Sequence, residues 1–161
     1  IDDRNNWRHK ILKSIELNYS KTPHFSSYWP FFKQCLEQDR RMLAELNEEL
    51  IRGCIEFLGI EVEIVKSSEL GVDAKGTDLI VEMCKAVGAD VYVSGQSGKE
   101  YLDEADVAAE GIGLVYQDFE HPQYRQVAEP FIPQLSVVDL LFNEGGKAGE
   151  YVRSAGTFAE S

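Results

Sequence analysis

The residues best suited to chemistry in this chain lie in two polar, glycine-rich loops between residues 67 and 103. The second loop, SGQSGKEY from Ser94 to Tyr101, offers hydroxyl groups, a lysine, and glycines that let the backbone approach a ligand closely. Each loop is expected to follow a strand, so both would emerge at the same edge of a parallel sheet, where α/β proteins bind ligands. The two loops therefore predict a ligand site, while the residues alone leave its reaction open.

The glycine spacing of the second loop is only weak evidence for phosphate binding. Gly95 and Gly98 match neither the Walker A loop, which needs a Lys-Ser/Thr pair, nor the dinucleotide-binding fingerprint. A plain tight turn explains the motif about as well, although the preceding strand modestly favours a phosphate cradle. The ligand-binding candidates of this loop are Ser94, Gly95, Ser97, Gly98, Lys99 and Tyr101.

The first loop runs from Ser67 to Asp78 and is longer than the roughly 2–6 residues usual between a strand and a helix. Extra length at such a position commonly serves a ligand or a lid. One residue of the pair Thr77 and Asp78 is better explained as a helix cap. The ligand-binding candidates of this loop are Ser67, Ser68, Glu69, Lys75, Thr77 and Asp78.

His121 is the candidate general base, since imidazole titrates near neutrality and Asp118 or Glu120 could orient it. An exposed loop histidine ordered by Pro122 is an equally good explanation. We expect Asp118 and His121 to be catalytic and to share the sheet edge with the two loops. No two histidines have metal-ligand spacing, so no metal site is expected, and the sequence identifies no cofactor.

Composition narrows the class of protein. Hydrophobic residues make up 43% of the 161 and charged residues 27%, as in ordinary globular domains. The net charge of −12 comes almost entirely from residues 67–161, where 17 Asp and Glu face 6 Lys and Arg. Such an acidic surface argues against nucleic acid as a partner. No apolar run reaches the roughly 20 residues of a membrane span, and three unpaired cysteines suit burial in a reducing compartment.

Hydrophobic periodicity predicts an α/β fold with a small parallel sheet of about three or four strands and a helical N-terminal region. Residues 1–161 are expected to form one domain, with a helical part (1–59), an α/β part (60–153) and a flexible tail (154–161). Aromatic residues between 19 and 32 are expected to pack in the core, although Tyr28 and Trp29 could instead line a ligand pocket. The first predicted helix runs through Trp7, Leu12 and Ile15 and is ended by Thr22-Pro23. The other predicted helices are 26–38, 41–58, 77–87, 103–110 and 137–142, and the predicted strands 61–65, 90–94 and 112–117.

Several segments, in order along most of the chain, resemble the WbqC-like protein family. They are Leu12-Lys13-Ser14-Ile15, Ser67-Ser68-Glu69-Leu70-Gly71, Lys75-Gly76-Thr77-Asp78, Tyr116-Gln117-Asp118-Phe119, His121-Pro122 and Ser136-Val137-Val138-Asp139-Leu140. The resemblance implies a bacterial, cytoplasmic protein linked to surface polysaccharides such as lipopolysaccharide O-antigen. It further implies a transferase that adds a small acyl or aminoacyl group to a nucleotide-linked amino sugar. The implied partner is thus a small molecule, a nucleotide sugar, and a homo-oligomer is compatible with the sequence.

One family feature is missing from this sequence. The family's opening His-Gln-Pro-x-Tyr-like strand has no counterpart, and the chain starts at Ile1, so we expect a fragment or a processed product. Without that strand we expect an unpaired sheet edge, an incomplete pocket, and an unstable or inactive chain. The alternative function is a noncatalytic binding or assembly module of a polysaccharide-biosynthesis complex, docking a partner enzyme through its aromatic helical front.

Overall fold

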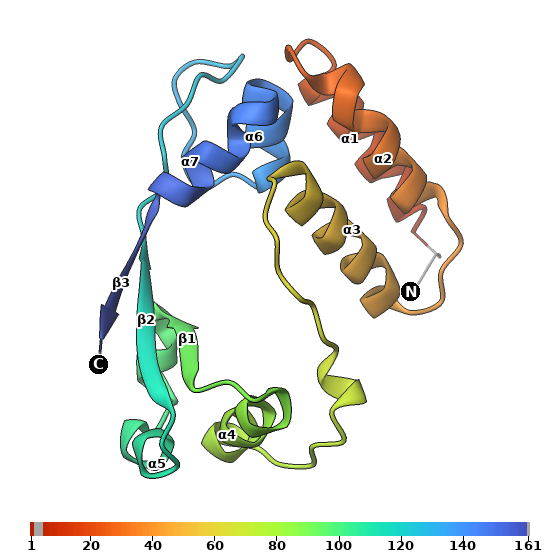
Figure 1. Ribbon diagram of the computed structural model, residues 1–161. Coiled ribbons are helices and arrows are strands. Elements are labelled where there is room, and N and C mark those ends of the chain that lie inside the picture. Colours follow the sequence, from red (N-terminus) through yellow and green to blue (C-terminus); the bar gives the residue numbers. More distant parts are fainter. Residues whose placement is uncertain (2–4, 161) are drawn as a thin grey trace. The chain divides into compact units, whose positions relative to one another are not determined.

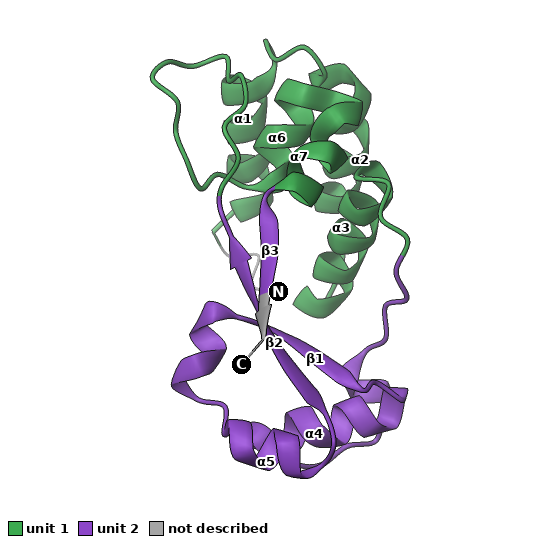
Figure 2. Cartoon of the chain, turned by 60° about the vertical axis from the view of Figure 1, so that its left-hand side comes forward, with its two compact units in different colours: residues 1–61, 121–154 green, residues 62–120, 155–161 purple. Residues whose placement is uncertain are grey.

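The computed structural model describes residue 1 and residues 5–160, with the side chains of 159 and 160 left aside. The chain divides into two compact units, each assembled from two stretches of sequence (Figure 2). Unit 1 comprises residues 1–61 and 121–154, and unit 2 comprises residues 62–120 and 155–161. The expected helical and α/β parts were contiguous along the chain, whereas these units interleave because residues 121–154 return to the helical unit.

Unit 1 is helical (Figure 1). Its elements are α1 (Trp7–Tyr19), α2 (Phe25–Glu37), α3 (Leu43–Phe57), α6 (Val137–Glu144), the 3-10 turn η3 (Gly145–Lys147) and α7 (Ala148–Ser154). Apolar residues at helical spacing predict α1, α2, α3 and α6, and all four form. Ser136 begins α6 as an N-cap, its hydroxyl accepting from the backbone N–H of Val138 at 3.3 Å.

Aromatic rings form the core of unit 1. Phe142 is fully buried, and its ring centroid lies 5.2 Å from those of Tyr19 and Phe25 and 5.7 Å from that of Phe32. Such tilted and edge-on ring pairs add to the stabilisation from burying apolar area. Trp29 belongs to the same core, so this aromatic group serves packing, as the sequence predicts.

Unit 2 contains a three-stranded sheet. Its elements are η1 (Ser67–Glu69), α4 (Gly76–Val87), β1 (Val91–Gly95), η2 (Gln96–Glu100), α5 (Glu104–Ala109), β2 (Gly113–Phe119) and β3 (Gly156–Glu160). β1 and β2 pair in parallel, and β3 pairs with β2 in the antiparallel direction. The predicted α/β class is confirmed, with a mixed sheet in place of the all-parallel one expected.

Two strand assignments from the sequence are wrong. Residues 61–65 alternate in polarity but form no strand, and they connect α3 to η1. Residues 156–160, expected to be part of a flexible tail, form β3 against β2. Alternation shows only that a segment could pair, whereas the strand forms where the chain brings a partner alongside.

The core of unit 2 lies between the sheet and the helices α4 and α5. Leu114 and Tyr116 of β2 contact Val107 of α5, which is fully buried, and Val81 of α4. Gly88 ends α4 in the left-handed conformation (φ 69°), as glycines at helix C-termini commonly do. Among the described residues, none of the helices combines the length and apolar character that crossing a membrane requires.

Candidate functional site

The end of the first glycine-rich loop is hydrogen-bonded to the segment that follows the second loop. Thr77, in the first turn of α4, accepts a hydrogen bond through its hydroxyl oxygen from the backbone N–H of Asp103, at 3.0 Å. The end of the first loop therefore lies next to Asp103, two residues beyond the end of the second loop. This contact is made by the first turn of α4. The strand expected at 61–65 does not form and has no part in it.

The second loop folds over a buried serine. Ser94 is 3% exposed, and its hydroxyl donates to the carbonyl of Gly95 at 3.0 Å. A side chain at Gly98 would overlap Ser94 Oγ, so any larger residue there would displace the Ser94 hydroxyl. Ser94 and Gly98 thus shape the loop from inside the protein, whereas Ser97 and Lys99 lie on its exposed side.

Lys99 and Asp118 occupy the same edge of the sheet. The Lys99 ammonium lies 4.8 Å from the centroid of the Tyr116 ring, within cation–π distance. Asp118 follows Gln117, which pairs with Gly95 at the carboxyl end of β1. Burial, together with a 2.8 Å hydrogen bond to Glu104, raises the pKa of the Tyr116 hydroxyl. This edge therefore combines a cation and a carboxylate.

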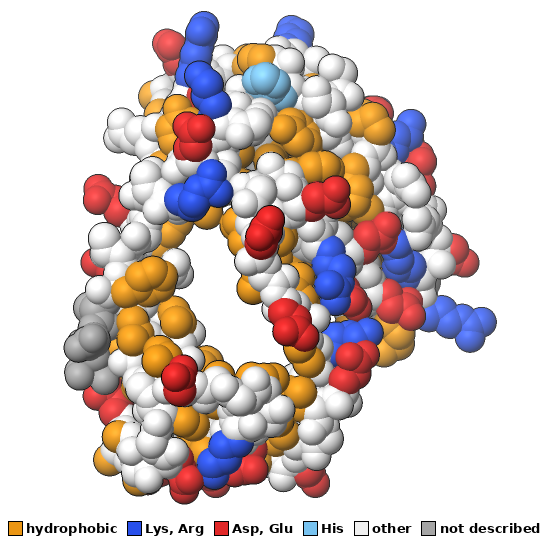
Figure 3. Space-filling model, in the orientation of Figure 1, with side chains coloured by type: hydrophobic (Ala, Val, Ile, Leu, Met, Phe, Trp, Pro, Cys, Tyr) orange, Lys and Arg blue, Asp and Glu red, His pale blue; other side chains and the backbone are white. Residues whose placement is uncertain are grey.

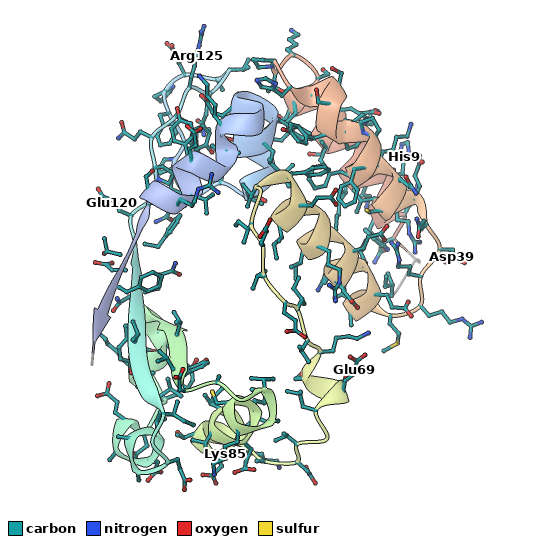
Figure 4. The ribbon with its side chains drawn as sticks, in the orientation of Figure 1. His9, Asp39, Glu69, Lys85, Glu120 and Arg125 are labelled. Carbon is teal, nitrogen blue, oxygen red and sulfur yellow. The ribbon has the colours of Figure 1, made fainter. Side chains whose placement is uncertain are left out.

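The other predicted ligand-binding residues lie on the surface of unit 2. Glu69, labelled in Figure 4, forms an ion pair with Lys66 at 3.0 Å within the exposed turn η1. Lys75 precedes α4 in extended conformation, and no side chain caps this helix N-terminus. Exposure leaves these side chains available to a ligand, and their binding role stays a prediction. The exposed members are Ser67, Ser68, Glu69, Lys75, Asp78, Gly95, Ser97, Lys99 and Tyr101.

His121 belongs to unit 1, while Asp118 and Glu120 belong to unit 2. The His121 ring packs beside two aromatic rings of unit 1, with centroids 6.1 Å from those of Tyr124 and Phe131. These contacts are what a histidine ordered by its own loop would make. The catalytic pairing of His121 with Asp118 stays a prediction.

A polar cavity in unit 1 was not predicted from the sequence. Its volume is about 300 Å³, and its lining comes from α1, the loop of residues 126–135, and α6. The polar lining residues include Ser14, Asn18, Tyr19, Gln126, Asp139 and Asn143. An adjoining cavity of about 490 Å³ shares Gln126 and Asn143 with it and also contacts Arg125, labelled in Figure 4.

A buried carboxylate organises this cavity. Asp139 is 4% exposed, and its Oδ2 accepts hydrogen bonds from the Tyr124 hydroxyl at 2.6 Å and from Gln126 Nε2 at 3.0 Å. The Gln126 amide also donates to the Ile132 carbonyl at 2.9 Å and accepts from the Ile132 N–H at 2.8 Å. Gln126 thereby fixes the loop that forms one wall.

Two tyrosine hydroxyls beside this carboxylate have raised pKa values. Burial and the neighbouring Asp139 raise the pKa of the Tyr19 hydroxyl to about 12. Burial, followed by the hydrogen bond to Asp139, likewise raises the pKa of the Tyr124 hydroxyl. Both tyrosines therefore stay protonated near neutral pH and act as hydroxyl donors.

The sequence of residues 136–143, SVVDLLFN, contains one indication of this site. Asp139 is the one charged residue among residues 136–143, and Asn143 follows at i+4, on the same helix face. A carboxylate amid apolar helix residues is expected to be buried with partners. The partners of Asp139 lie outside this segment, on α1 and on the loop that contains Tyr124 and Gln126. The segment alone therefore could not predict the cavity.

Fold and site define a two-unit α/β protein with a sheet-edge loop pair and a separate polar cavity. The family model described as the WbqC-like protein family matches residues 1–151, and the chain belongs to this family. Uncharacterized protein Rv1507c of Mycobacterium tuberculosis (strain ATCC 25618 / H37Rv) is 29% identical over 153 residues, or 94% of this chain. The chain spans 66% of that relative's length. No solved structure matches the chain significantly.

Proposed function

We propose that the chain is part of a transferase that adds a small acyl or aminoacyl group to a nucleotide-linked amino sugar. The reaction would serve surface-polysaccharide synthesis, such as that of O-antigen, in the bacterial cytoplasm, as the family resemblance implies. The supporting observation is that the first turn of α4, whose N-terminus no side chain caps, is hydrogen-bonded to Asp103, four residues beyond Lys99. Free backbone N–H groups at a helix N-terminus favour phosphate binding.

Unit 2 is acidic, so its few lysines are important for attracting a phosphate group. Residues 62–120 contain 13 Asp and Glu but only 4 Lys and Arg, and two of these four, Lys75 and Lys99, flank the proposed phosphate site. A diphosphate would otherwise meet an acidic surface. Ser97 would add a hydroxyl donor, while Asp118 or His121 would accept the proton from the amine that attacks the activated acyl carbon.

Calorimetric titration of the protein with a panel of nucleotide sugars tests this site. Lys99→Ala is expected to weaken binding at least about fivefold, because it removes a charge-assisted contact to phosphate. Lys85→Ala is the matched control, since Lys85 lies in the last turn of α4 and pairs with Glu82 and Glu110 (Figure 4). Equal effects of the two substitutions, or no binding of any nucleotide sugar, would reject the proposed phosphate site.

The second candidate function is a noncatalytic assembly module, and a different observation favours it. An apolar groove of about 420 Å³ in unit 1 exposes Ile11 and Ile51, which are 41% and 52% exposed. The face of the helical unit in Figure 3 shows interspersed acidic and basic side chains beside hydrophobic ones. Copurification of a stable partner, with full turnover retained in His121→Ala and Asp118→Ala, would favour this function over the transferase.

A further inference from the structure

The polar cavity of unit 1 holds a buried carboxylate without a cation. Asp139 receives hydrogen bonds from the hydroxyl of Tyr124 and the amide of Gln126. Across residue 1 and residues 5–160, no Lys, Arg or His forms an ion pair with it. Burial of a charge is costly unless a counter-charge or several hydrogen bonds compensate it. The two hydrogen bonds compensate part of this cost, and a positively charged ligand would add a counter-charge.

A second, independent observation points to the same kind of ligand. Asn143 is 7% exposed and lines both adjoining cavities, and its Nδ2 donates to the Asp139 carbonyl at 2.8 Å. That bond fixes the orientation of the amide, so Oδ1 is the remaining atom, and it has no hydrogen-bond partner within the described chain. A buried acceptor of this kind usually receives a donor from water or from a ligand.

The neighbouring groups leave mainly acceptors for a ligand. The Thr22 hydroxyl donates to the Tyr19 carbonyl at 2.8 Å, so its oxygen presents lone pairs. Val127 and Leu135 line the rest of the cavity and suit the carbon skeleton of a small molecule. At about 300 Å³ the cavity matches the lower end of the size range for small-molecule sites.

We propose that this cavity binds a small ligand through a primary ammonium group, with Asp139 and Asn143 as its acceptors. Amino sugars and amino acids both carry this group, and the two sources share the recognition chemistry. The ammonium site lies in unit 1 and does not depend on the nucleotide site proposed for unit 2. Either site can therefore fail while the other stands.

Calorimetric titration of the whole chain with four probes tests the ligand chemistry. Glucosamine and alanine carry a free amine, whereas N-acetylglucosamine and N-acetylalanine keep the skeleton but lose the positive charge. At least one free amine is expected to bind about tenfold or more tightly than its acetylated partner, because only the amine can pair with Asp139. The amine that binds identifies the source. If neither amine binds at millimolar concentration, or if acetylation has no effect, the proposal is overturned.

Two exposed positions of α1 test the location without disturbing the core. Ser14→Lys adds a positive charge at the cavity lining, and Leu17→Lys adds the same charge at a 74% exposed position outside the lining. Ser14→Lys is expected to weaken binding of the amine at least about threefold, and Leu17→Lys to leave it nearly unchanged. Equal effects of the two substitutions on affinity would show that the amine binds outside this cavity. Asp139→Asn should abolish binding of the amine. If that variant fails to fold, the comparison of Ser14→Lys with Leu17→Lys still tests where the amine binds.

Discussion

Asp139 illustrates how a single side chain can set the chemistry of its surroundings. Its carboxylate lies inside a helical unit, and it is held by a tyrosine hydroxyl and a glutamine amide rather than by a basic residue. Hydroxyl and amide donors stabilise the charged form without neutralising it. Among the described residues that line this cavity, Asp139 alone is of a charged type, and this property suits a cationic ligand.

Removing one of these hydrogen-bond donors should therefore lower the free energy of unfolding more than removing a tyrosine hydroxyl that forms no hydrogen bond. Tyr124→Phe keeps the ring but deprives the buried carboxylate of its 2.6 Å hydrogen bond. The free energy of unfolding is expected to fall by about 1–3 kcal/mol, measured by urea denaturation. Tyr28→Phe is the control, because the Tyr28 ring packs on Phe57 and the described residues provide no hydrogen bond for its hydroxyl. Equal losses in both variants would contradict this account.

The raised pKa of Tyr19 predicts a loss of stability at alkaline pH. Burial and Asp139 raise this pKa to about 12, so the folded state holds the proton more tightly than the unfolded state, where tyrosine titrates near 10. The contribution is complete below about pH 10 and falls as the pH rises from 10 to about 12. Denaturation curves measured between pH 10 and about pH 12 should show that the free energy of unfolding declines less steeply in Tyr19→Phe than in the unchanged chain. Tyr101→Phe, at a 62% exposed position, should leave the decline unaltered.

At the residue scale, the sequence identifies members of the sheet-edge loops but not their roles. Ser94 was expected to offer its hydroxyl to a ligand, yet it is buried and donates to Gly95. Asp139 was not predicted because Tyr19 is far from it in sequence and because Gln126 lies on a loop whose path the local sequence does not specify. Composition and spacing show which groups are present, whereas tertiary contacts decide which of them face a cavity.

At the scale of elements, helices could be predicted more reliably than strands. The stripe Leu46, Leu50 and Cys54 predicts α3 because its apolar residues repeat at the period of a helix. Strands need a partner that the local sequence does not specify. Val62 and Ile64 alternate with glutamates yet form no strand, while the unremarkable segment 156–160 pairs with β2.

The short helix α7 depends on a glycine at its contact with the end of α3. A side chain at Gly149 would overlap the carbonyl oxygen of Leu58, a backbone atom that cannot swing aside. Gly149→Ala is expected to lower the free energy of unfolding by about 2 kcal/mol or more. Gly146→Ala is the matched control, because an added methyl group meets nothing within 4 Å there. Thermal or urea unfolding of both variants measures the difference, and a neutral Gly149→Ala would show that the contact is not close.

At the scale of the whole molecule, the chain divides its buried hydrophobic residues between the two units. Trp29, Phe142 and Leu141 belong to the core of unit 1, and Val107, Leu114 and Tyr116 to that of unit 2. The chain leaves unit 1 after residue 61, returns at residue 121, and leaves again after residue 154. Separate cores of this kind allow each unit to open with its own free energy.

Hydrogen exchange should therefore resolve two opening free energies. Val107→Ala removes two methyl groups from a fully buried position in unit 2 and should cost about 2 kcal/mol there. Amides of α4 and β2 are expected to exchange faster in this variant, while amides of α2 and α3 keep their protection. Gly149→Ala should produce the opposite pattern, because its overlap lies within unit 1. If either substitution lowers protection equally in both units, the two cores unfold as a single cooperative structure.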